Sequence, residues 1–183
     1  MLALIASLAL TQQSNAGLPP TILPDMTGES VQLPDPNAKA TVMLFIAVDC
    51  PISNRYAPEL GRICQAYKDK GVSFYRVYLD DSFTKDEILS HGKEFKMPNT
   101  AFLDMKHKLV DMLGMTVTPE AAVVSSSGTI LYRGRIDDLY LEHGRVRDGE
   151  YRRDLRVALD EFLAGKPISK PFTTAIGCGI PGK

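Results

Sequence analysis

A nearly continuous run of apolar and β-branched residues, from Ala40 to Val48, places the strongest constraint on the fold. Such a run is typical of a strand that is buried on both faces within an α/β sheet. It stops just before Cys50, and apolar residues then recur at helical spacing from Ile52 to Lys70. The sequence therefore predicts a strand, a cysteine and a helix, in that order.

The remaining elements extend this α/β pattern. We expect strands over 72–79 and 101–103, helices over 86–95, 106–113 and 150–163, a small hairpin around 26–29 that leads into 31–33, and a second hairpin from 121–125 and 129–132. The polar stretch 140–149 is expected to be a loop. Strands that alternate with helices favour parallel pairing, whereas the second hairpin adds antiparallel strands. The sheet should therefore be mixed.

Length and charge limit the kind of protein this is. The chain has 183 residues, of which 44% are hydrophobic, and this is enough for one ordinary core. Its formal net charge is −1, and its lysines and arginines do not cluster on one segment. We therefore expect one globular domain that does not bind nucleic acid.

The N-terminus has the pattern of an export signal. Leu2 to Leu10 is almost wholly apolar, and Ser14-Asn15-Ala16 gives a small-x-small cleavage site. We predict a signal peptide over 1–16, although no basic residue precedes the apolar stretch; a membrane anchor or a disordered leader is the alternative. No transmembrane candidate follows Ala16. The mature protein is therefore expected to be periplasmic or secreted, with no stable membrane span.

Cys50 is placed where a thiolate is favoured. At a helix N-terminus its sulfur faces unpaired backbone N–H groups and the positive end of the helix dipole. Pro51 suits the first helical position, because its missing N–H is one of those unpaired donors anyway. Asp49 opposes a negative sulfur, whereas Arg55 favours it. The competing interpretation is a small buried apolar residue, but the surrounding stretch, D-C-P-I-S-N-R, is polar, so we predict a reactive thiol.

Four separated motifs resemble one known family. They are F-I-A-V-D-C-P-I-S-N-R-Y-A-P-E-L, Y-R-G-R-I-D-D, L-A-G-K-P-I and A-I-G-C-G-I. Together they resemble the peroxiredoxin-like redoxin family, which is related to the AhpC/TSA group. The resemblance implies a thioredoxin-like three-layer sandwich, with a central mixed sheet flanked by helices. The redoxin domain would span 17–168, followed by a Pro/Gly-rich tail over 169–183 that carries Cys178.

The resemblance also implies a set of site residues. By position, Pro119 would be the cis-proline that lies against the active-site cysteine, and the backbone of Thr118 would pair with a bound thiol substrate. The start of the helix would supply Pro51, Ser53, Asn54 and Arg55 around Cys50. Peroxiredoxins place an arginine near the thiolate, which implies a supporting role for Arg133. A solvated or salt-bridged strand end, with Arg135, Asp137 and Asp138 close by, is the alternative for Arg133.

The other two cysteines have different surroundings. Cys64 follows Leu60 by four residues on the apolar helix face, which points it into the core. Cys178 lies between Gly177 and Gly179 in the tail, a setting that allows a thiol to move. We hypothesise that Cys178 resolves Cys50 by forming a disulfide. A stapling disulfide or an unpaired tail thiol stays open as an alternative.

Two departures from the family pattern leave the reaction open. Thioredoxins use a Cys-x-x-Cys pair, but Ser53 replaces the second cysteine. Typical peroxiredoxins have a proline and a threonine where this chain has Met43 and Ala47. A dithiol cycle within the motif is therefore excluded, and the substrate is either a peroxide or a disulfide.

The sequence predicts a thiol-dependent oxidoreductase that works through a Cys50 thiolate. Its partners would be an external thiol reductant or a thiol/disulfide protein. No cofactor is expected, and no metal, because His91, His107 and His143 share no ligand spacing. The competing function is a non-catalytic thioredoxin-fold module of the cell envelope that binds a partner or handles copper.

Overall fold

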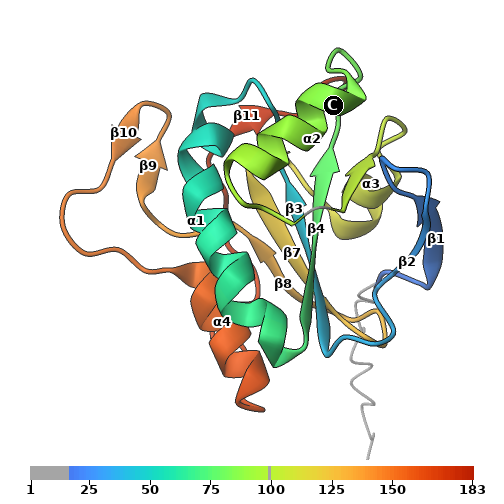
Figure 1. Cartoon of the computed structure of the whole chain (residues 1–183). Coiled ribbons are helices and arrows are strands. Elements are labelled where there is room, and N and C mark those ends of the chain that lie inside the picture. Colours follow the sequence, from blue (N-terminus) through green and yellow to red (C-terminus); the bar gives the residue numbers. More distant parts are fainter. Residues whose placement is uncertain (1–16, 99) are drawn as a thin grey trace, which may run out of the picture.

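A five-stranded mixed sheet forms the centre of the protein in the computed structural model, which describes residues 17–98 and 100–183 (Figure 1). The strand order is β5-β4-β3-β7-β8, and the bounds are β3 Ala40–Phe45, β4 Val72–Tyr78, β5 Ala101–Leu103, β7 Glu120–Ser125 and β8 Ile130–Gly134. Strands β3, β4 and β5 run parallel, whereas β7 is antiparallel to β3 and to β8. The predicted mixed sheet is therefore confirmed.

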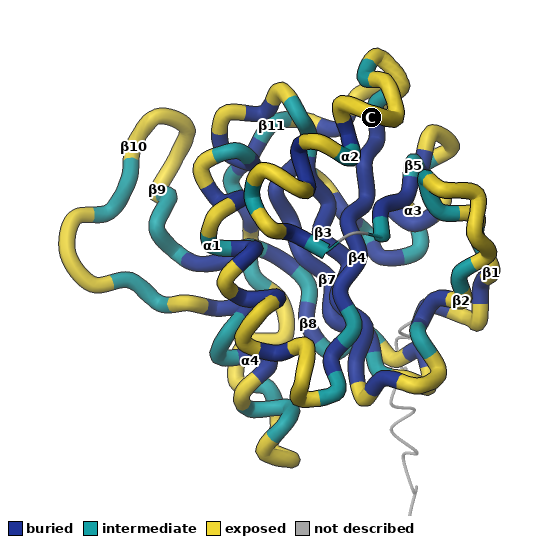
Figure 2. The backbone as a smooth tube through the Cα atoms, in the orientation of Figure 1, coloured by how far each residue is buried: buried dark blue, intermediate teal, exposed yellow. Residues whose placement is uncertain are grey.

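Helices cover both faces of this sheet. The helices α1 (Pro51–Tyr67), α2 (Lys85–Glu94) and α4 (Asp154–Leu163) pack on one face, through residues such as Leu60, Ile88 and Leu159. Helix α3 (Lys108–Leu113) covers the other face, together with the small hairpin of β1 (Thr21–Pro24) and β2 (Ser30–Leu33). The sheet is accordingly buried between two apolar layers (Figure 2), which confirms the three-layer arrangement.

The central strand β3 leads to the cysteine and helix in the order that the sequence predicts. All six of its residues are buried. The strand ends at Phe45, three residues earlier than the apolar run suggests. One reason is that the Ala47 N–H donates to the Ser53 hydroxyl of α1 instead of to a neighbouring strand. Ala47 and Val48 therefore form a half-buried loop between β3 and α1.

The expectation of a loop over 140–149 is wrong in part. Strands β9 (Tyr140–Glu142) and β10 (Arg145–Val146) form a hairpin that projects from the body of the molecule in Figure 1. Gly144 lies in its turn with φ 77°, a left-handed conformation that glycine adopts without steric cost. The hairpin was not predicted because its strands are polar and give no periodic apolar signal. Its tight turn depends on a single glycine and not on apolar patterning.

The last helix begins at Asp154 and not at Glu150 as the periodicity suggests. The preceding segment is held in a different conformation, because the Asp138 N–H donates to the Arg152 carbonyl. The buried Asp154 carboxylate accepts from Arg135 and Arg152, each at 2.7 Å. Contacts with distant residues such as Asp138 and Arg135 thus shift the start of the helix from where local apolar spacing puts it.

The C-terminal tail lies against the domain. The Arg133 N–H donates to the Pro171 carbonyl, and the Thr173 N–H donates back to Arg133. Further along, β11 (Cys178–Gly179) pairs antiparallel with β6 (Val117–Thr118). The tail is thus a docked segment, whereas glycine and proline content alone suggested a mobile one.

The predicted signal peptide over 1–16 lies outside the described residues. Among the helices that are described, none is long and apolar enough to cross a membrane.

Candidate active site

Cys50 occupies the N-cap position of helix α1, as the sequence predicts. Its sulfur accepts from the Ser53 N–H at 3.5 Å, and its carbonyl accepts from the Asn54 N–H at 2.9 Å. Pro51 is the first helical residue and is exposed, whereas Cys50 itself is only 2% exposed. The helix N-terminus therefore presents both a backbone donor and its positive dipole end to this sulfur, an arrangement that stabilises a thiolate.

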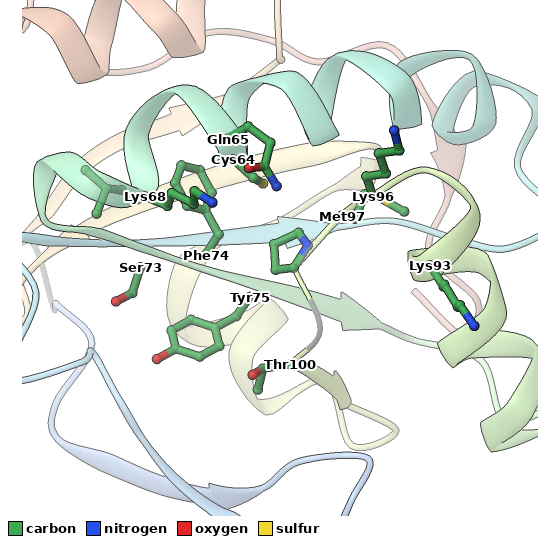
Figure 3. Close-up of a pocket in the computed structure, with 12 residues that line it drawn as sticks. Cys64, Gln65, Lys68, Ser73, Phe74, Tyr75, Lys93, Lys96, Met97 and Thr100 are labelled. Atoms are coloured by element: carbon green, nitrogen blue, oxygen red, sulfur yellow. The ribbon is translucent and has the colours of Figure 1, made fainter.

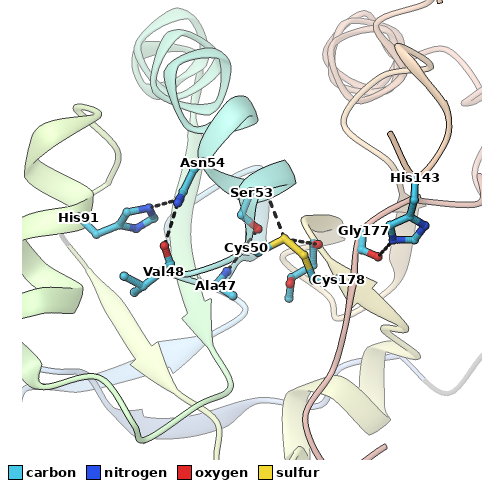
Figure 4. The surroundings of a disulfide bond; sticks show 10 residues. Ala47, Val48, Cys50, Ser53, Asn54, His91, His143, Gly177 and Cys178 are labelled. Atoms are coloured by element: carbon cyan, nitrogen blue, oxygen red, sulfur yellow. Dashed lines mark hydrogen bonds between the residues drawn. A yellow bond between two sulfur atoms is a disulfide. The ribbon is translucent and has the colours of Figure 1, made fainter. Parts of the chain in front are cut away.

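The structure joins Cys50 to Cys178 in a disulfide (Figure 4). Their Cα atoms lie 6.1 Å apart although 128 positions separate them in the sequence. The hypothesised pairing is therefore present, and Cys64 is the free cysteine, buried as predicted.

The Thr118–Pro119 peptide bond is cis, as the resemblance implies, and Thr118 lies against the disulfide. The Cys50 sulfur is 3.3 Å from the Thr118 carbonyl oxygen. A disulfide sulfur carries no proton, so this is a contact in the oxidised protein, but a reduced thiol at the same place can donate to that oxygen. In the β-pairing Cys178 lies opposite Thr118. The tail therefore occupies the backbone position that the resemblance assigns to a thiol substrate.

The approach of the tail depends on one glycine. A Cβ atom at Gly177 would lie 2.2 Å from the Thr118 carbonyl oxygen, far inside van der Waals contact, whereas one at Gly179 would have no neighbour within 4 Å. The Gly177 carbonyl also accepts from the His143 ring at 2.6 Å. Only the first of the two flanking glycines is thus required for the close approach of Cys178 to Cys50.

Two further predicted residues, Ser53 and Asn54, hold the loop before Cys50. The Ser53 hydroxyl accepts from the Ala47 N–H at 3.3 Å, and the Asn54 amide donates to the Val48 carbonyl at 2.8 Å. His91 of α2 contacts Asn54 in turn (Figure 4). The contact of His91 with Asn54 could not be predicted from the sequence, because the two residues are 37 positions apart on different helices.

The contacts found for the two predicted arginines are with other residues than Cys50. Arg55 is exposed, with its guanidinium carbon 5.8 Å from the centre of the Tyr140 ring. Arg133 pairs with Ala122, whose side chain belongs to the α3 side of the sheet, and it donates to the Gly114 carbonyl and lies over Phe172. Cys50 belongs to the opposite apolar layer. The placement of Arg133 thus gives no support to its expected role beside the thiolate.

The expected salt bridges at this strand end are formed by Arg135. It contacts Asp138, at 3.7 Å, as well as the buried Asp154. Asp137 instead accepts a hydrogen bond from Tyr56. Burial raises the pKa of the Asp137 carboxyl, an effect that the Tyr56 hydrogen bond opposes.

A cavity of about 150 Å³ adjoins the disulfide. Val48, Leu79 and Phe83 contribute apolar walls, and Asp49 and Asp80 contribute carboxylates. Within the described residues, no group of three or more histidine, cysteine or acidic side chains is arranged to hold a metal ion.

A larger pocket of about 580 Å³ lies near the other end of α1, with Cys64 in its wall and Lys68, Lys93 and Lys96 around it (Figure 3). Cys64 is 14 residues along the helix from Cys50, which corresponds to about 21 Å. Burial raises the pKa of the Cys64 thiol to about 12. The Cys64 thiol is therefore protonated at neutral pH, which disfavours it as a nucleophile.

A mixed sheet with a cysteine at the N-terminus of its first long helix, and a cis-proline beside that cysteine, defines a thioredoxin-fold protein. Comparison with known proteins agrees with this class and narrows it. Residues 15–133 match the AhpC/TSA family. The chain belongs to the AhpC/TSA family, as the four motifs indicate. No curated protein matches the sequence.

Solved structures with the same fold include proteins from several bacteria. An uncharacterized conserved protein from Geobacillus kaustophilus is 28% identical, with a TM-score of 0.77 over 91% of this chain and 90% of that one. A hypothetical protein from Sinorhizobium meliloti is 23% identical, with a TM-score of 0.75 over 90% and 92%. The thioredoxin domain of a thiol-disulfide oxidoreductase from Bacteroides vulgatus is 21% identical, with a TM-score of 0.59 over 80% and 95%.

Proposed function

We propose that this protein is a thiol-disulfide oxidoreductase in which Cys50 is the attacking thiolate and Cys178 the resolving thiol. The observation that carries the proposal is the Cys50–Cys178 disulfide, formed at the N-terminus of α1 and against the cis-proline loop. A disulfide that only stabilises the fold needs neither a helix N-terminus nor a cis-proline loop beside it. A thiol that must ionise and then meet a second sulfur needs both.

The reaction is a two-electron exchange. The Cys50 thiolate attacks one sulfur of a substrate disulfide, which forms a mixed disulfide and releases the first substrate thiolate. Cys178, having lost its proton, then attacks the Cys50 sulfur, so that the second substrate thiolate leaves and the Cys50–Cys178 bond forms. Both leaving thiolates take up protons. An external dithiol reverses these steps on the protein and becomes oxidised itself.

The surroundings of Cys50 favour a disulfide over a peroxide as the substrate. Cleavage of a peroxide bond requires stabilisation of the oxygen that leaves, for which arginine is well suited. Among the described residues, the polar contacts found at the Cys50 sulfur are with the Ser53 N–H and the Thr118 carbonyl, and none is with an arginine. The substrate backbone, in contrast, has a place at Thr118, which Cys178 fills in the oxidised protein.

The same proposal extends to location and partners. A disulfide persists in an oxidising compartment, which suits a protein exported by the predicted signal peptide over 1–16 to the periplasm or the medium. The partners would be thiol or disulfide proteins. The redoxin domain of 17–168 and the tail of 169–183 would then act as one unit, with the tail supplying the second thiol.

Turnover with a supplied reductant tests this function. Wild type and the Cys50→Ser variant are compared on a protein disulfide and on hydrogen peroxide. We expect wild type to reduce the disulfide much faster than the variant does. Faster turnover of peroxide alone would overturn the choice of substrate. Equal rates of wild type and variant on both substrates would overturn the enzyme and favour a binding module.

A further inference from the structure

A chain of buried and partly buried hydrogen bonds connects helix α2 to the loop that precedes α1. The Asn54 side-chain amide donates to the Val48 carbonyl at 2.8 Å, and its Oδ1 lies 2.9 Å from His91 Nε2. On the other side of the ring, His91 Nδ1 lies 2.8 Å from the Tyr78 hydroxyl, which accepts from Arg76 at 2.8 Å. Figure 4 shows the Asn54 end of this chain beside the disulfide.

One proton arrangement satisfies every bond in this chain. A carbonyl only accepts, so the NH₂ group of Asn54 must face Val48, and its oxygen must face His91. His91 then carries its proton on Nε2, and Nδ1 accepts from the Tyr78 hydroxyl. Burial and the Arg76 guanidinium lower the pKa of His91, which keeps the ring neutral and Nδ1 able to accept. Each donor therefore points toward the Val48 carbonyl.

The anchor of the chain is rigid. Arg76 is 1% exposed, and it donates to the carbonyls of Pro98 and Ile88 as well as to Tyr78. A Cβ atom added at Gly92 would lie only 2.2 Å from the Arg76 guanidinium, so helix α2 packs directly on Arg76. His91, the neighbour of that glycine, is therefore held at a fixed place above β4.

The other end of the chain reaches the reactive site. Val48 is two residues before Cys50, and both Val48 and Tyr78 line the cavity beside the disulfide. A fixed Val48 carbonyl limits the conformations of the loop that delivers Cys50 to the N-terminus of α1. A small displacement of a nucleophile from its productive position is enough to slow a reaction strongly.

We propose that His91 is a positioning residue for Cys50, which acts by fixing Asn54 and, through it, the Val48 carbonyl. The inference deepens the proposed function, because it takes Cys50 as the reactive thiol. It assigns His91 no contact with the substrate. The effect of His91 is on how precisely the Cys50 sulfur is positioned.

Two variants of similar polarity separate positioning from packing. In His91→Gln the side-chain amide reaches the level of Nε2 and can still donate to Asn54. In His91→Asn the amide is one methylene shorter and stays near Tyr78. In the reduced protein at neutral pH, we expect His91→Asn to lower the rate of Cys50 alkylation by about tenfold. His91→Gln should stay within about twofold of wild type by the same reasoning.

A double-mutant cycle shows whether the effect passes through Asn54. In an Asn54→Ala background, His91→Asn should cause no further loss of rate, since the link it breaks is already absent. Equal rates in the two His91 variants, or an undiminished effect in the Asn54→Ala background, would overturn the proposal. A shared failure to fold would overturn it too, because His91 would then be purely structural. Alkylation needs no substrate, so its result stands even if disulfide turnover fails.

Discussion

At the scale of single residues, two cysteines at helix α1 lie in opposite surroundings. Cys50 is at the N-cap of α1 and faces a backbone donor. Cys64 is buried on the apolar face of the same helix, and burial raises its pKa to about 12. Under the proposed function, helix position and solvation would thus make Cys50 and not Cys64 the reactive thiol. Gly177 matters for a different reason, because its lack of a side chain lets Cys178 approach Cys50.

Replacement of Gly177 by alanine is expected to hinder the Cys50–Cys178 disulfide. The added Cβ would collide with the Thr118 carbonyl, and the short strand β11 would have to shift away from β6. Gly179→Ala is the matched control, because its Cβ would point into open space. Titration of free thiols after mild oxidation measures the outcome. Equal disulfide yields and rates in the two variants would show that the close approach at Gly177 is unimportant.

At the scale of elements, the segment β6 and the cis-proline after it depend on a buried carboxylate. Glu120 is 4% exposed and begins β7 directly after Pro119. Its Oε2 accepts from the Thr116 N–H at 2.7 Å and from the Val117 N–H at 3.4 Å. Glu120 therefore closes the turn that places Thr118 against Cys50.

Removal of this carboxylate should loosen the turn. Glu120→Ala leaves its two backbone donors without that acceptor, and we expect a loss of about 1–3 kcal/mol in the free energy of unfolding. Glu120→Gln keeps an oxygen acceptor and should lose less. Urea denaturation of the oxidised proteins measures both. A Glu120→Ala variant as stable as wild type would contradict the role given to this residue.

The regular elements were predictable because their signals are local. Apolar spacing gave β3, α1, α2 and the β7–β8 hairpin to within a few residues. The start of α4 was missed, since Asp154 there is bound by Arg135, which is 19 positions away, as well as by the nearby Arg152. The pairing of β11 with β6 was missed for the same reason: two residues carry no periodicity, and their partner is about 60 positions away.

In the candidate site, too, the residues with a local signal or a family resemblance were predictable, and those that depend on distant partners were not. Cys50, Ser53 and the cis Thr118–Pro119 bond lie where the strand-helix order and the family resemblance put them. The sheet face on which Arg133 lies could not be predicted, because it depends on the register of β8, which a single sequence does not show. His91 was missed because a buried hydrogen-bond partner across two elements leaves no pattern in a single sequence.

At the scale of the whole molecule, the disulfide ties the end of the chain to the first long helix. Its two cysteines are 128 positions apart, and the tail between α4 and Cys178 runs along β8 on its way. A bond that closes such a long loop restricts the unfolded chain strongly. Oxidation of the site should therefore stabilise the entire domain.

Reduction is expected to lower the free energy of unfolding markedly. The entropy of closing a loop of on the order of 100 residues corresponds to about 5 kcal/mol as an upper figure. Urea denaturation with and without a reductant measures the change. The Cys178→Ser variant should resemble reduced wild type and show no response to the reductant. Coinciding transitions of oxidised and reduced wild type would rule out this stabilising role.

The most direct test of the central claim is to identify which sulfur attacks a disulfide. Reduced Cys178→Ser protein is treated with oxidised glutathione, and the adduct is located by peptide mass mapping. We predict a stable mixed disulfide on Cys50, whereas wild type releases the glutathione and forms the Cys50–Cys178 bond. An adduct on Cys64, or an unmodified Cys50 in the variant, would contradict the account.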